Sequence, residues 1–533
     1  MKAYKMKAQR VEWKGELQMQ YITDVREAKE IDRMTIQEIG IPSMVLMEKA
    51  ALAVAGCVKS NATPESHVLA VCGMGNNGGD GVAAARMLWE DGYPVTVSLI
   101  GNEENASEEM KKQLDIARKL GIHICTGLPS GEYDVILDAL FGIGLSREVT
   151  GEFADAINWI NEQDALRFAV DVPSGVNAST GEILAVAVVA DFTITFGTNK
   201  RGIVLFPGCN YAGNVVVADI GFPKKVVEKV SPRTYTLTRE DAMEMMPPRI
   251  LRSNKGSYGK VLVIAGSPEI SGACYLSAAA AYRMGCGLVK VFTAAENGPV
   301  IKNLLPEALV KTYDSELDYT QSLNRFDITK SLQEEIKWAT CIVIGPGIGT
   351  AEPAGIMLDE VLKEKNKAVV IDADGLNVLA KKETYFVKRE DGTRKICLPE
   401  NVVLTPHLQE MTRLTRFELP AIRAKIVEQA LLSLESANCQ TLVLKDARTV
   451  VTDGGEVYIN TIGNNALSTG GTGDVLSGMI AGLLAQGMRP TKAAVLGVCL
   501  HGFAAEEYVR RKGGRYSMMA GDLLDMLQEI LPK

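Results

Sequence analysis

An acidic residue beside a glycine-rich turn is the first feature of this sequence that could carry chemistry. Gly470-Gly471-Thr472-Gly473-Asp474 opens directly into the apolar segment Val475 to Gln486. Glycines let the backbone crowd a bound anion, and the free amides at the start of the following helix attract phosphate. An acid there would repel the ligand unless it has a task, such as taking a proton from a substrate hydroxyl. The competing interpretation is that Asp474 only caps the helix.

A second glycine-rich turn lies in the first half of the chain. The apolar run Val68 to Cys72 is followed by Gly73-Met74-Gly75-Asn76-Asn77-Gly78-Gly79-Asp80-Gly81, which contains a GxGxxG pattern. As a dehydrogenase fingerprint this pattern is weak, because the next predicted strand has no clear ribose-binding acid at its tip. The amide oxygens of Asn76 and Asn77, together with the Asp80 carboxylate, suit a cation or a sugar hydroxyl.

Two more acids follow apolar runs and stand next to tight turns. Asp138 precedes the glycine loop Gly142-Ile143-Gly144, and a second turn reads Asp171-Val172-Pro173-Ser174-Gly175. Ligands bind beyond the carboxyl ends of strands in open α/β sheets, so we expect these loops to meet. They predict an oxygen-only pocket for one hard cation, with one carboxylate left free as an acid or base. The alternative for each Asp taken singly is that it caps a turn.

The elements that must position these residues alternate between short β-rich runs and helix-period segments. This alternation predicts an α/β fold with mostly parallel sheets covered by helices, and it occurs twice. The first series of predicted strands is Val68–Cys72, Val95–Ile100, Val135–Leu140, Phe168–Val172, Phe192–Phe196 and Val215–Ile220. The second series is Val261–Ala265, Leu288–Phe292, Cys341–Ile344, Ala368–Ile371, Val402–Thr405 and Thr441–Leu444.

Helix and linker signals complete this outline. Asp24 and Glu27 form a capping-box pattern for a helix running toward Ile39, and Ser277 to Met284 is a small-residue helix. The Pro-containing stretch Phe222 to Lys255 interrupts the strand rhythm, and we predict that it connects two domains.

Composition limits the classes of function. The 533 residues are too many for one core, and 57 Lys and Arg against 65 Asp and Glu, a net charge of −8, give no support for nucleic-acid binding. No segment has the roughly 18 uninterrupted apolar residues of a membrane span. Residues 1–20 are basic but lack the apolar centre of a signal peptide, and we expect them to be an extension.

Cysteine and histidine usage points to a reducing compartment and against a multi-His metal site. The ten cysteines show no CxxC pair, so a cytoplasmic location is expected. They are Cys57, Cys72, Cys125, Cys209, Cys274, Cys286, Cys341, Cys397, Cys439 and Cys499. Of the four histidines, only His407, directly after a predicted strand and Pro406, is placed in a site.

The motifs resemble those of two known families. Residues 21–225 are similar to the NAD(P)HX epimerase family, through the turns described above at Gly75 to Gly81, Asp138 to Gly144 and Asp171 to Gly175. Residues 235–533 resemble the ADP-dependent NAD(P)HX dehydratase family. The segments that carry this second resemblance are Lys255–Lys260, Ala265–Ser267, Ser271–Ala273, Gly345–Gly349, Asp372–Asp374, Thr405–His407 and Gly470–Asp474. The resemblance implies a Rossmann-like α/β/α domain followed by a ribokinase-like α/β domain.

For the first domain the resemblance implies interconversion of the R and S epimers of hydrated NADH or NADPH. Potassium would be bound by Asn77, Asp138 and Ser174. Asp171 would be the acid or base of the epimerisation. The residues expected to touch substrate are Asn76, Asn77, Gly78, Gly79, Asp80, Gly142, Ile143, Gly144, Leu145, Ser146, Arg147, Glu148 and Asp171.

For the second domain the resemblance implies dehydration of the S epimer with ADP as co-substrate, Mg²⁺, and release of AMP and phosphate. The hydrated cofactor would contact Ala273, Gly347, His407 and Asp474. The nucleotide would contact Lys445, Asp446, Ala447, Arg448, Thr449 and Gly473. Phosphorylation would turn a poor leaving group into a good one, with Asp474 taking the hydroxyl proton and the Gly471 to Gly473 amides stabilising the transferred group.

Several positions depart from the family patterns. His407 is followed by Leu408 and Gln409 where the family usually has Pro and Gly, and Asp446 and Arg448 replace small or hydroxyl residues. Lys49 stands where Asn is frequent. None of these changes removes a proposed catalytic group. The partners expected are small molecules, with no nucleic acid or membrane, in a homo-oligomer.

Three alternatives stay open at this point. The first is a ribokinase-like kinase for a vitamin precursor, fused to a nucleotide-binding module, because such kinases share the GxGD element. The second is a first domain that serves only as a binding or dimerisation scaffold, against which Asp80, Asp138 and Asp171 argue. The third is a dinucleotide-dependent dehydrogenase.

Overall fold

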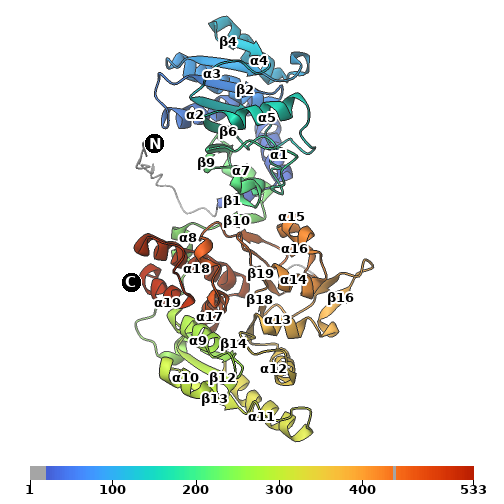
Figure 1. Cartoon of the computed structure of the whole chain (residues 1–533), viewed down its shortest axis with the longest axis vertical. Coiled ribbons are helices and arrows are strands. Elements are labelled where there is room, and N and C mark those ends of the chain that lie inside the picture. The colour runs from blue at the N-terminus through green and yellow to red at the C-terminus, as the bar shows by residue number, and fades with distance from the viewer. Residues whose placement is uncertain (1–19, 436–439, 533) are drawn as a thin grey trace.

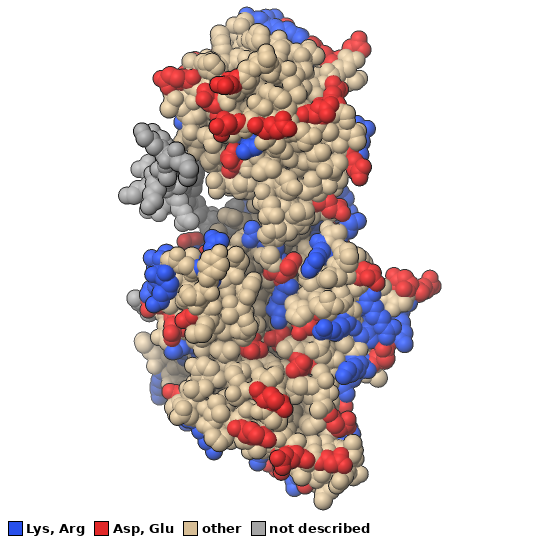
Figure 2. All heavy atoms as spheres, viewed as in Figure 1, with Lys and Arg blue, Asp and Glu red and all other residues tan. Residues whose placement is uncertain are grey.

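Two lobes make up the chain. The computed structural model describes residues 20–435 and 440–532. Residues 1–19 of the predicted extension and Cys439 lie outside the described residues. The N-terminal lobe, blue to green in Figure 1, is joined to the C-terminal lobe, green to red, near β1 (Gln20–Thr23) and β10 (Thr234–Thr236). On the face drawn in Figure 2, acidic and basic side chains are interspersed over both lobes.

The N-terminal lobe is built on a parallel sheet of seven strands, ordered β4-β3-β2-β5-β6-β7-β9. In chain order the strands are β2 (Val68–Cys72), β3 (Val95–Leu99), β4 (His123–Thr126), β5 (Val135–Ala139), β6 (Leu166–Val170), β7 (Phe192–Phe196) and β9 (Asn214–Ala218). Successive side chains of a strand point to opposite faces. Accordingly Val68 and Ala70 pack in one core cluster, and Leu69 and Val71 pack in another.

Helices cover both faces of this sheet. Helices α2 (Ser43–Lys59), α3 (Asn76–Glu90) and α4 (Glu108–Leu120) supply the cluster on one face, and α5 (Glu152–Glu162) supplies the other. The predicted capping box is confirmed, because Asp24 accepts from the Glu27 amide at 2.9 Å and Glu27 accepts from the Asp24 amide at 3.0 Å. Helix α1 (Val25–Arg33) continues as the π-helix Met34–Ile39.

The C-terminal lobe is built on a larger sheet of twelve strands, ordered β13-β12-β11-β14-β15-β18-β19-β20-β21-β10-β1-β8. Every neighbouring pair from β13 to β19 is parallel, whereas β19–β20 and β20–β21 are antiparallel. In chain order the strands of this lobe are β11 (Lys260–Ile264), β12 (Leu288–Ala294), β13 (Leu309–Tyr313), β14 (Cys341–Ile344), β15 (Ala368–Ile371), β18 (Val402–Leu404), β19 (Thr441–Leu444), β20 (Val450–Thr452) and β21 (Val457–Ile459). A separate hairpin is formed by β16 (Phe386–Lys388) and β17 (Arg394–Ile396).

Helices again form a layer on each face of the sheet. One face carries α9 (Gly272–Arg283), α17 (Thr472–Ala485), α18 (Pro490–Lys512) and α19 (Ala520–Ile530). The other carries α11 (Ser322–Trp338), α12 (Glu352–Leu362), α13 (Asp374–Leu379), α14 (Leu408–Thr415), α15 (Leu419–Ala424) and α16 (Ile426–Leu432). Helix α10 (Asn297–Leu304) follows β12.

Three short strands continue the large sheet into the first lobe. β10 (Thr234–Thr236) pairs with β21, β1 (Gln20–Thr23) pairs with β10, and β8 (Asn199–Lys200) pairs with β1. The short helix α6 (Arg201–Val204) follows β8 directly. Ile22, Val204 and Leu205 belong to the same core cluster as β20 and β21 of the second lobe. The two lobes therefore share a sheet and part of a core.

The predicted linker is more structured than the sequence indicated. Within residues 222–255 the structure has α7 (Lys224–Val230), β10 and α8 (Arg239–Glu244). Since β10 is only three residues long, its pairing with β1 and β21 defines it, and its own sequence does not. The sequence predicted that residues 222–255 interrupt the series of strands. That prediction was wrong for residues 234–236, which form β10.

The twelve strands predicted from apolar runs are all present, with ends that match the prediction or shift by at most two residues. In the described part of the chain the nine cysteines are free thiols. None of the described helices combines the length and the apolar character required to cross a membrane.

Candidate functional sites

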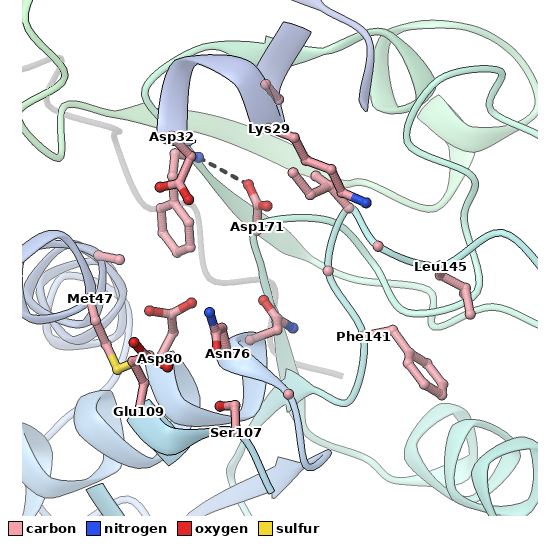
Figure 3. A pocket seen from close by; sticks show the side chains of 18 of the residues that line it. Lys29, Asp32, Met47, Asn76, Asp80, Ser107, Glu109, Phe141, Leu145 and Asp171 are labelled. Atoms are coloured by element: carbon pink, nitrogen blue, oxygen red, sulfur yellow. Dashed lines mark hydrogen bonds between the residues drawn. The ribbon is translucent and has the colours of Figure 1, made fainter. Parts of the chain in front are cut away.

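The first candidate site is a cavity of 960 Å³ in the N-terminal lobe. Its wall includes Asn76 at the start of α3, the loop after β5, Asp171 after β6 and Thr198 after β7. All of these positions follow the carboxyl ends of parallel strands, as the sequence predicted. Figure 3 shows the side chains that face the cavity.

Asp171 is held from several sides at the cavity wall. Its Oδ1 lies 2.9 Å from Lys200 Nζ and accepts hydrogen bonds from Thr195 Oγ1 at 3.1 Å and from the Phe196 amide at 3.2 Å. Its φ of 68° lies in the left-handed region, which is uncommon outside glycine. Strained backbone of this kind persists where the surroundings fix it, often in active sites.

Lys200 is almost entirely buried beneath Asp171. Only 3% of its surface is exposed, and its ammonium also donates to the carbonyls of Phe196 at 2.8 Å and Thr198 at 3.1 Å. Both carbonyls belong to the end of β7 and the turn into β8. The ammonium is thus placed to keep a negative charge at Asp171.

Other carboxyl groups face the same cavity without such a partner. Burial, with the charges of Asp171 and Asp32, raises the pKa of Asp80 well above its ordinary value. Burial, with Asp171 and Glu109, also raises the pKa of Asp32. The cavity thus combines one carboxylate paired with an ammonium and others for which the protonated form is favoured.

Of the three residues predicted to bind potassium, Asp138 and Ser174 are in direct contact, and Asn77 lies at the cavity wall. Ser174 Oγ lies 2.5 Å from Asp138 Oδ1, and the Ser174 amide donates to Asp138 Oδ2 at 2.8 Å. A Cβ built on Gly142 would lie 3.1 Å from Asn77 Oδ1, so the Asn77 side chain reaches the Gly142 loop. Burial raises the pKa of Asp138 to about 6.

Two features of this cluster fit a monovalent cation. The donors are oxygens of carboxylate, hydroxyl and amide groups, and the Asn77 Nδ2 is buried with no hydrogen-bond partner. Carboxamide nitrogen and oxygen are interchangeable by rotation, so that orphaned atom marks a position an amide oxygen can fill toward a cation. Among the described residues no three His, Cys, Asp or Glu side chains form a metal cluster, which leaves such oxygen-rich sites as the candidates.

Most of the residues predicted to touch substrate line the cavity. They are Asn76, Asn77, Asp80, Gly142, Ile143, Gly144, Leu145, Ser146, Arg147 and Asp171. Gly78, Gly79 and Glu148 are not part of the wall. A Cβ on Gly78 would lie 1.8 Å from the Gly73 carbonyl, so this glycine permits a close backbone approach beneath the site.

Sequence analysis missed four charged groups of this cavity. Lys29 and Asp32 come from α1, Glu109 from the first turn of α4, and Lys200 from β8. The i, i+3 spacing of Lys29 and Asp32 on a capped helix was a usable signal for a shared face. Lys200 had no such signal, because only the fold brings it beneath Asp171.

The second candidate site surrounds Asp474 in the C-terminal lobe. Asp474 lies in the first turn of α17, and the N-cap Gly471 has a φ of 90° that suits glycine. Burial and the charge of Asp372 raise the pKa of Asp474 to about 7. Ser277 of α9 donates to the Asp474 carbonyl at 3.1 Å, which anchors this turn to the neighbouring helix.

A buried ion pair lies next to Asp474. Lys445 Nζ is 2.8 Å from Asp372 Oδ1, and Ser477 donates to Asp372 Oδ2 at 2.6 Å. Burial opposes ionisation, but the Lys445 charge and these hydrogen bonds hold the pKa of Asp372 below its ordinary value. A Cβ on Gly473 would lie 3.4 Å from Lys445 Nζ, so the glycine turn and the lysine face each other.

The remaining predicted contacts to the hydrated cofactor come from separate elements. Gly347 and Ala273 are adjacent, because a Cβ on Gly347 would lie 3.3 Å from the Ala273 Cβ. His407 is the N-cap of α14, and its Nδ1 accepts from the amides of Gln409 at 3.1 Å and Glu410 at 3.3 Å. Its side chain is still 51% exposed. Burial and Lys445 lower the pKa of His407, which favours the neutral ring that these amides require.

The residues predicted to contact the nucleotide, 445–449, differ in their surroundings. Asp446 and Ala447 are exposed, and Thr449 Oγ1 donates to the Asp446 carbonyl at 3.2 Å. The Arg448 side chain turns toward the first lobe, where Nε donates to the Val204 carbonyl at 3.1 Å, and Nη1 donates to the Thr461 carbonyl at 3.0 Å. Its guanidinium is therefore engaged at the junction of the lobes.

Comparison with known proteins gives similarity over nearly the whole chain. A family described as "NAD(P)H-hydrate dehydratase" matches residues 261–529, and one described as "YjeF-related protein N-terminus" matches residues 43–202. The bifunctional NAD(P)H-hydrate repair enzyme Nnr of Moorella thermoacetica is 36% identical over 531 residues, covering 96% of each chain. The enzyme of the same name from Coxiella burnetii is 33% identical, covering 95% of this chain and 98% of that protein.

One solved structure similar to the second lobe is an ADP/ATP-dependent NAD(P)H-hydrate dehydratase from Bacillus subtilis co-crystallised with ATP and Mg²⁺. It is 31% identical, with a TM-score of 0.46, and the match covers 55% of this chain and 96% of that one.

Proposed function

The chain belongs to the bifunctional NAD(P)H-hydrate repair family, and from this we propose that its two sites divide the repair of hydrated nicotinamide cofactors between them. The first domain interconverts the R and S epimers of NAD(P)HX. The second removes water from the S epimer with ADP, and yields NAD(P)H, AMP and phosphate. The observation that carries this assignment is the presence of an acid, Asp171 or Asp474, at the ligand-binding end of each sheet.

The cavity of the first lobe supplies the epimerase site. Its 960 Å³ volume and its mixed wall of glycine backbone, amides and carboxyl groups suit a dihydronicotinamide ring with its ribose. The Asp171 carboxylate, fixed by Lys200, is placed to take a proton from, or return one to, an oxygen at the hydroxyl-bearing carbon.

Potassium binding at Asn77, Asp138 and Ser174 is part of this proposal. Bound there, the cation would supply positive charge beside the buried Asp138 and tie the loop after β5 to the loop after β6. The chain's own contribution is to fix those loops, which carry Gly142 and Asp171 at the cavity wall.

In the second domain Asp474 takes the proton of the substrate hydroxyl while that oxygen attacks the terminal phosphorus of ADP. AMP leaves, and the phosphorylated substrate then loses phosphate and a ring proton to restore the double bond. The Gly471 to Gly473 amides at the start of α17 stabilise charge on the transferred group. Ala273, Gly347 and His407 contact the hydrated cofactor.

The nucleotide lies along Lys445 to Thr449 and Gly473 in this proposal. Lys445 faces the Gly473 turn and offers a positive charge to a phosphate. Arg448 contributes through its backbone, because its guanidinium is bonded to Val204 and Thr461. Mg²⁺ enters with the ADP phosphates, which supply much of its coordination.

The test follows dihydronicotinamide absorbance on a mixture of R and S hydrates with ADP, Mg²⁺ and K⁺. The unaltered protein should recover all of the cofactor. Asp474→Asn should recover none, and Asp171→Asn should recover the S fraction and then slow or stop. Absence of recovery with either ADP or ATP, together with a stable phosphorylated product from a small alcohol, would instead support a vitamin-precursor kinase.

A further inference from the structure

Two carboxyl groups line the epimerase cavity at different places on its wall. In Figure 3, Asp171, which follows β6, lies above Asp80, which comes from α3. Both residues line the same cavity, and their charges influence each other. Between them lies the space into which the reacting ring would fit.

The surroundings of the two groups are opposite in character. Asp171 has an ammonium at 2.9 Å and accepts hydrogen bonds from Thr195 and Phe196, all of which favour the carboxylate. Asp80 has no ion pair and no hydrogen bond among the described residues, and its strongest charge interactions are with Asp171 and Asp32. Burial beside like charges favours the neutral acid.

The other charged residues around the cavity do not change this contrast. They are Lys29 and Asp32 on α1, Glu109 on α4, Arg147 in the loop after β5, and Lys200 on β8. Lys200 is committed to Asp171 and to two backbone carbonyls. Neither Lys29 nor Arg147 forms an ion pair with Asp80.

We propose that Asp80 is a second catalytic residue of the epimerase site: it donates a proton to the departing hydroxyl on one face of the ring, while Asp171 takes a proton from water adding to the other face. This inference rests on the proposed epimerase function. Asp80, predicted above only to touch substrate, becomes the general acid, and Asp171 is the general base.

The chemistry balances without a further reagent. The hydroxyl-bearing carbon adjoins the ring nitrogen, so the nitrogen lone pair forms a C=N bond as the C–O bond breaks and water leaves with the Asp80 proton. A water molecule on the opposite face forms the new C–O bond and gives a proton to Asp171. The product is the other epimer, with Asp80 ionised and Asp171 protonated. The reverse reaction uses the two residues in exchanged roles.

The first test replaces Asp80 by Asn, which keeps the shape but removes the acid. We expect kcat for epimerisation to fall by about 10²-fold or more in both directions, with KM within about twofold, because a general acid contributes in the transition state. Asp91→Asn is the matched control: Asp91 caps the far end of the same helix, and within residues 20–435 and 440–532 its one ion pair is an exposed one with Lys59 at 2.7 Å. It should keep full activity.

The second test follows oxygen exchange in H₂¹⁸O. Each turnover of the unaltered enzyme should place one ¹⁸O in the product hydroxyl, and Asp80→Asn should lose exchange and epimerisation together. Epimerisation without label incorporation would overturn the proposed route. A raised KM with unchanged kcat in Asp80→Asn would leave Asp80 as a binding residue only.

Two controls separate this inference from the assigned function. Dehydratase activity of the second domain should persist in Asp80→Asn, which shows that the chain has folded. If the unaltered protein fails to interconvert the epimers, the epimerase assignment itself is wrong, whereas an active wild type with an equally active Asp80→Asn overturns only the role of Asp80.

Discussion

At the scale of single residues, the two proposed catalytic acids work in different surroundings. Asp171 is paired with the buried ammonium of Lys200. Asp474 is partly buried beside Asp372, whose charge is already matched by Lys445. Burial and the charge of Asp372 raise the pKa of Asp474, so the dehydratase activity should respond to pH near neutrality. The epimerase activity should respond to removal of the Lys200 charge.

The pH dependence of the dehydratase follows from Asp474. Because burial and Asp372 raise its pKa to about 7, Asp474 is protonated below that pH and cannot accept the hydroxyl proton. We expect kcat/KM to rise about tenfold per pH unit below 7 and to level off above it. The measurement is dehydration of the pure S epimer between pH 5 and 9. A rate that is flat from pH 5 to 7 would contradict Asp474 as the base.

Lys200 is predicted to be a positioning residue for Asp171. Lys200→Met removes the ammonium 2.9 Å from the carboxylate, so the epimerisation kcat should fall by up to about 10²-fold through misplacement of the acid. Lys200→Arg should recover part of that loss, since it restores the charge. Lys225→Met, at an exposed position of α7, is the control. A change in KM alone would assign Lys200 to substrate binding instead.

At the scale of elements, glycine decides how closely α17 can approach α9. A Cβ on Gly478 would lie 2.1 Å from the Ser277 carbonyl, and Ser277 itself bonds the Asp474 carbonyl. The position of α17, which carries Asp474, therefore requires glycine at residue 478. Close packing of this kind does not tolerate an added methyl group without displacement.

Gly478→Ala should accordingly lower stability by about 1–3 kcal/mol and reduce dehydratase activity while epimerisation persists. Gly355→Ala is the matched control, because Gly355 lies in α12 with nothing within 4 Å of its missing Cβ. That change should be neutral or stabilise by up to about 1 kcal/mol. Denaturant unfolding together with both activity assays provides the comparison; equal stability of the two variants would show that α17 and α9 have room to adjust.

At the scale of the whole molecule, the lobes are joined through structure that also reaches the epimerase site. Lys200 pairs in register with Thr23 of β1, and β1 in turn pairs with β10 of the large sheet. The next residue, Arg201, lies 3.5 Å from Asp24 and 3.3 Å from Glu428 on α16. The residue that holds Asp171 is thus fixed by the junction between the lobes (Figure 1).

A substitution of Arg448, in the second lobe, tests whether the contact between the lobes stabilises the protein. Arg448→Ala removes the hydrogen bonds to the Val204 and Thr461 carbonyls, and we expect a loss of about 1–3 kcal/mol in stability. The KM for ADP should stay within about twofold, because only the backbone of residue 448 is expected to meet the nucleotide. Thermal unfolding and ADP titration distinguish the roles, and a KM raised tenfold at unchanged stability would place the guanidinium in the nucleotide site.

The strands that could be predicted from the sequence are those with their own apolar runs. β14 and β15 read Cys341 to Ile344 and Ala368 to Ile371 as uninterrupted apolar segments, and their predicted ends match the structure. β1 (QYIT), β8 (NK) and β10 (TYT) contain no uninterrupted apolar run. Such segments are strands because they pair with neighbouring strands, and a local pattern does not contain that information.

The sequence by itself determined the two α/β domains, the family resemblance and the acids Asp171 and Asp474, because glycine turns and strand ends are encoded locally. Only the tertiary structure decided that Lys200 supports Asp171, that Asp80 lines the same cavity, and that Arg448 turns toward Val204. These relations join residues distant in the chain. Their charge states depend on burial and on neighbours, which exist only once the sheets and helices have packed.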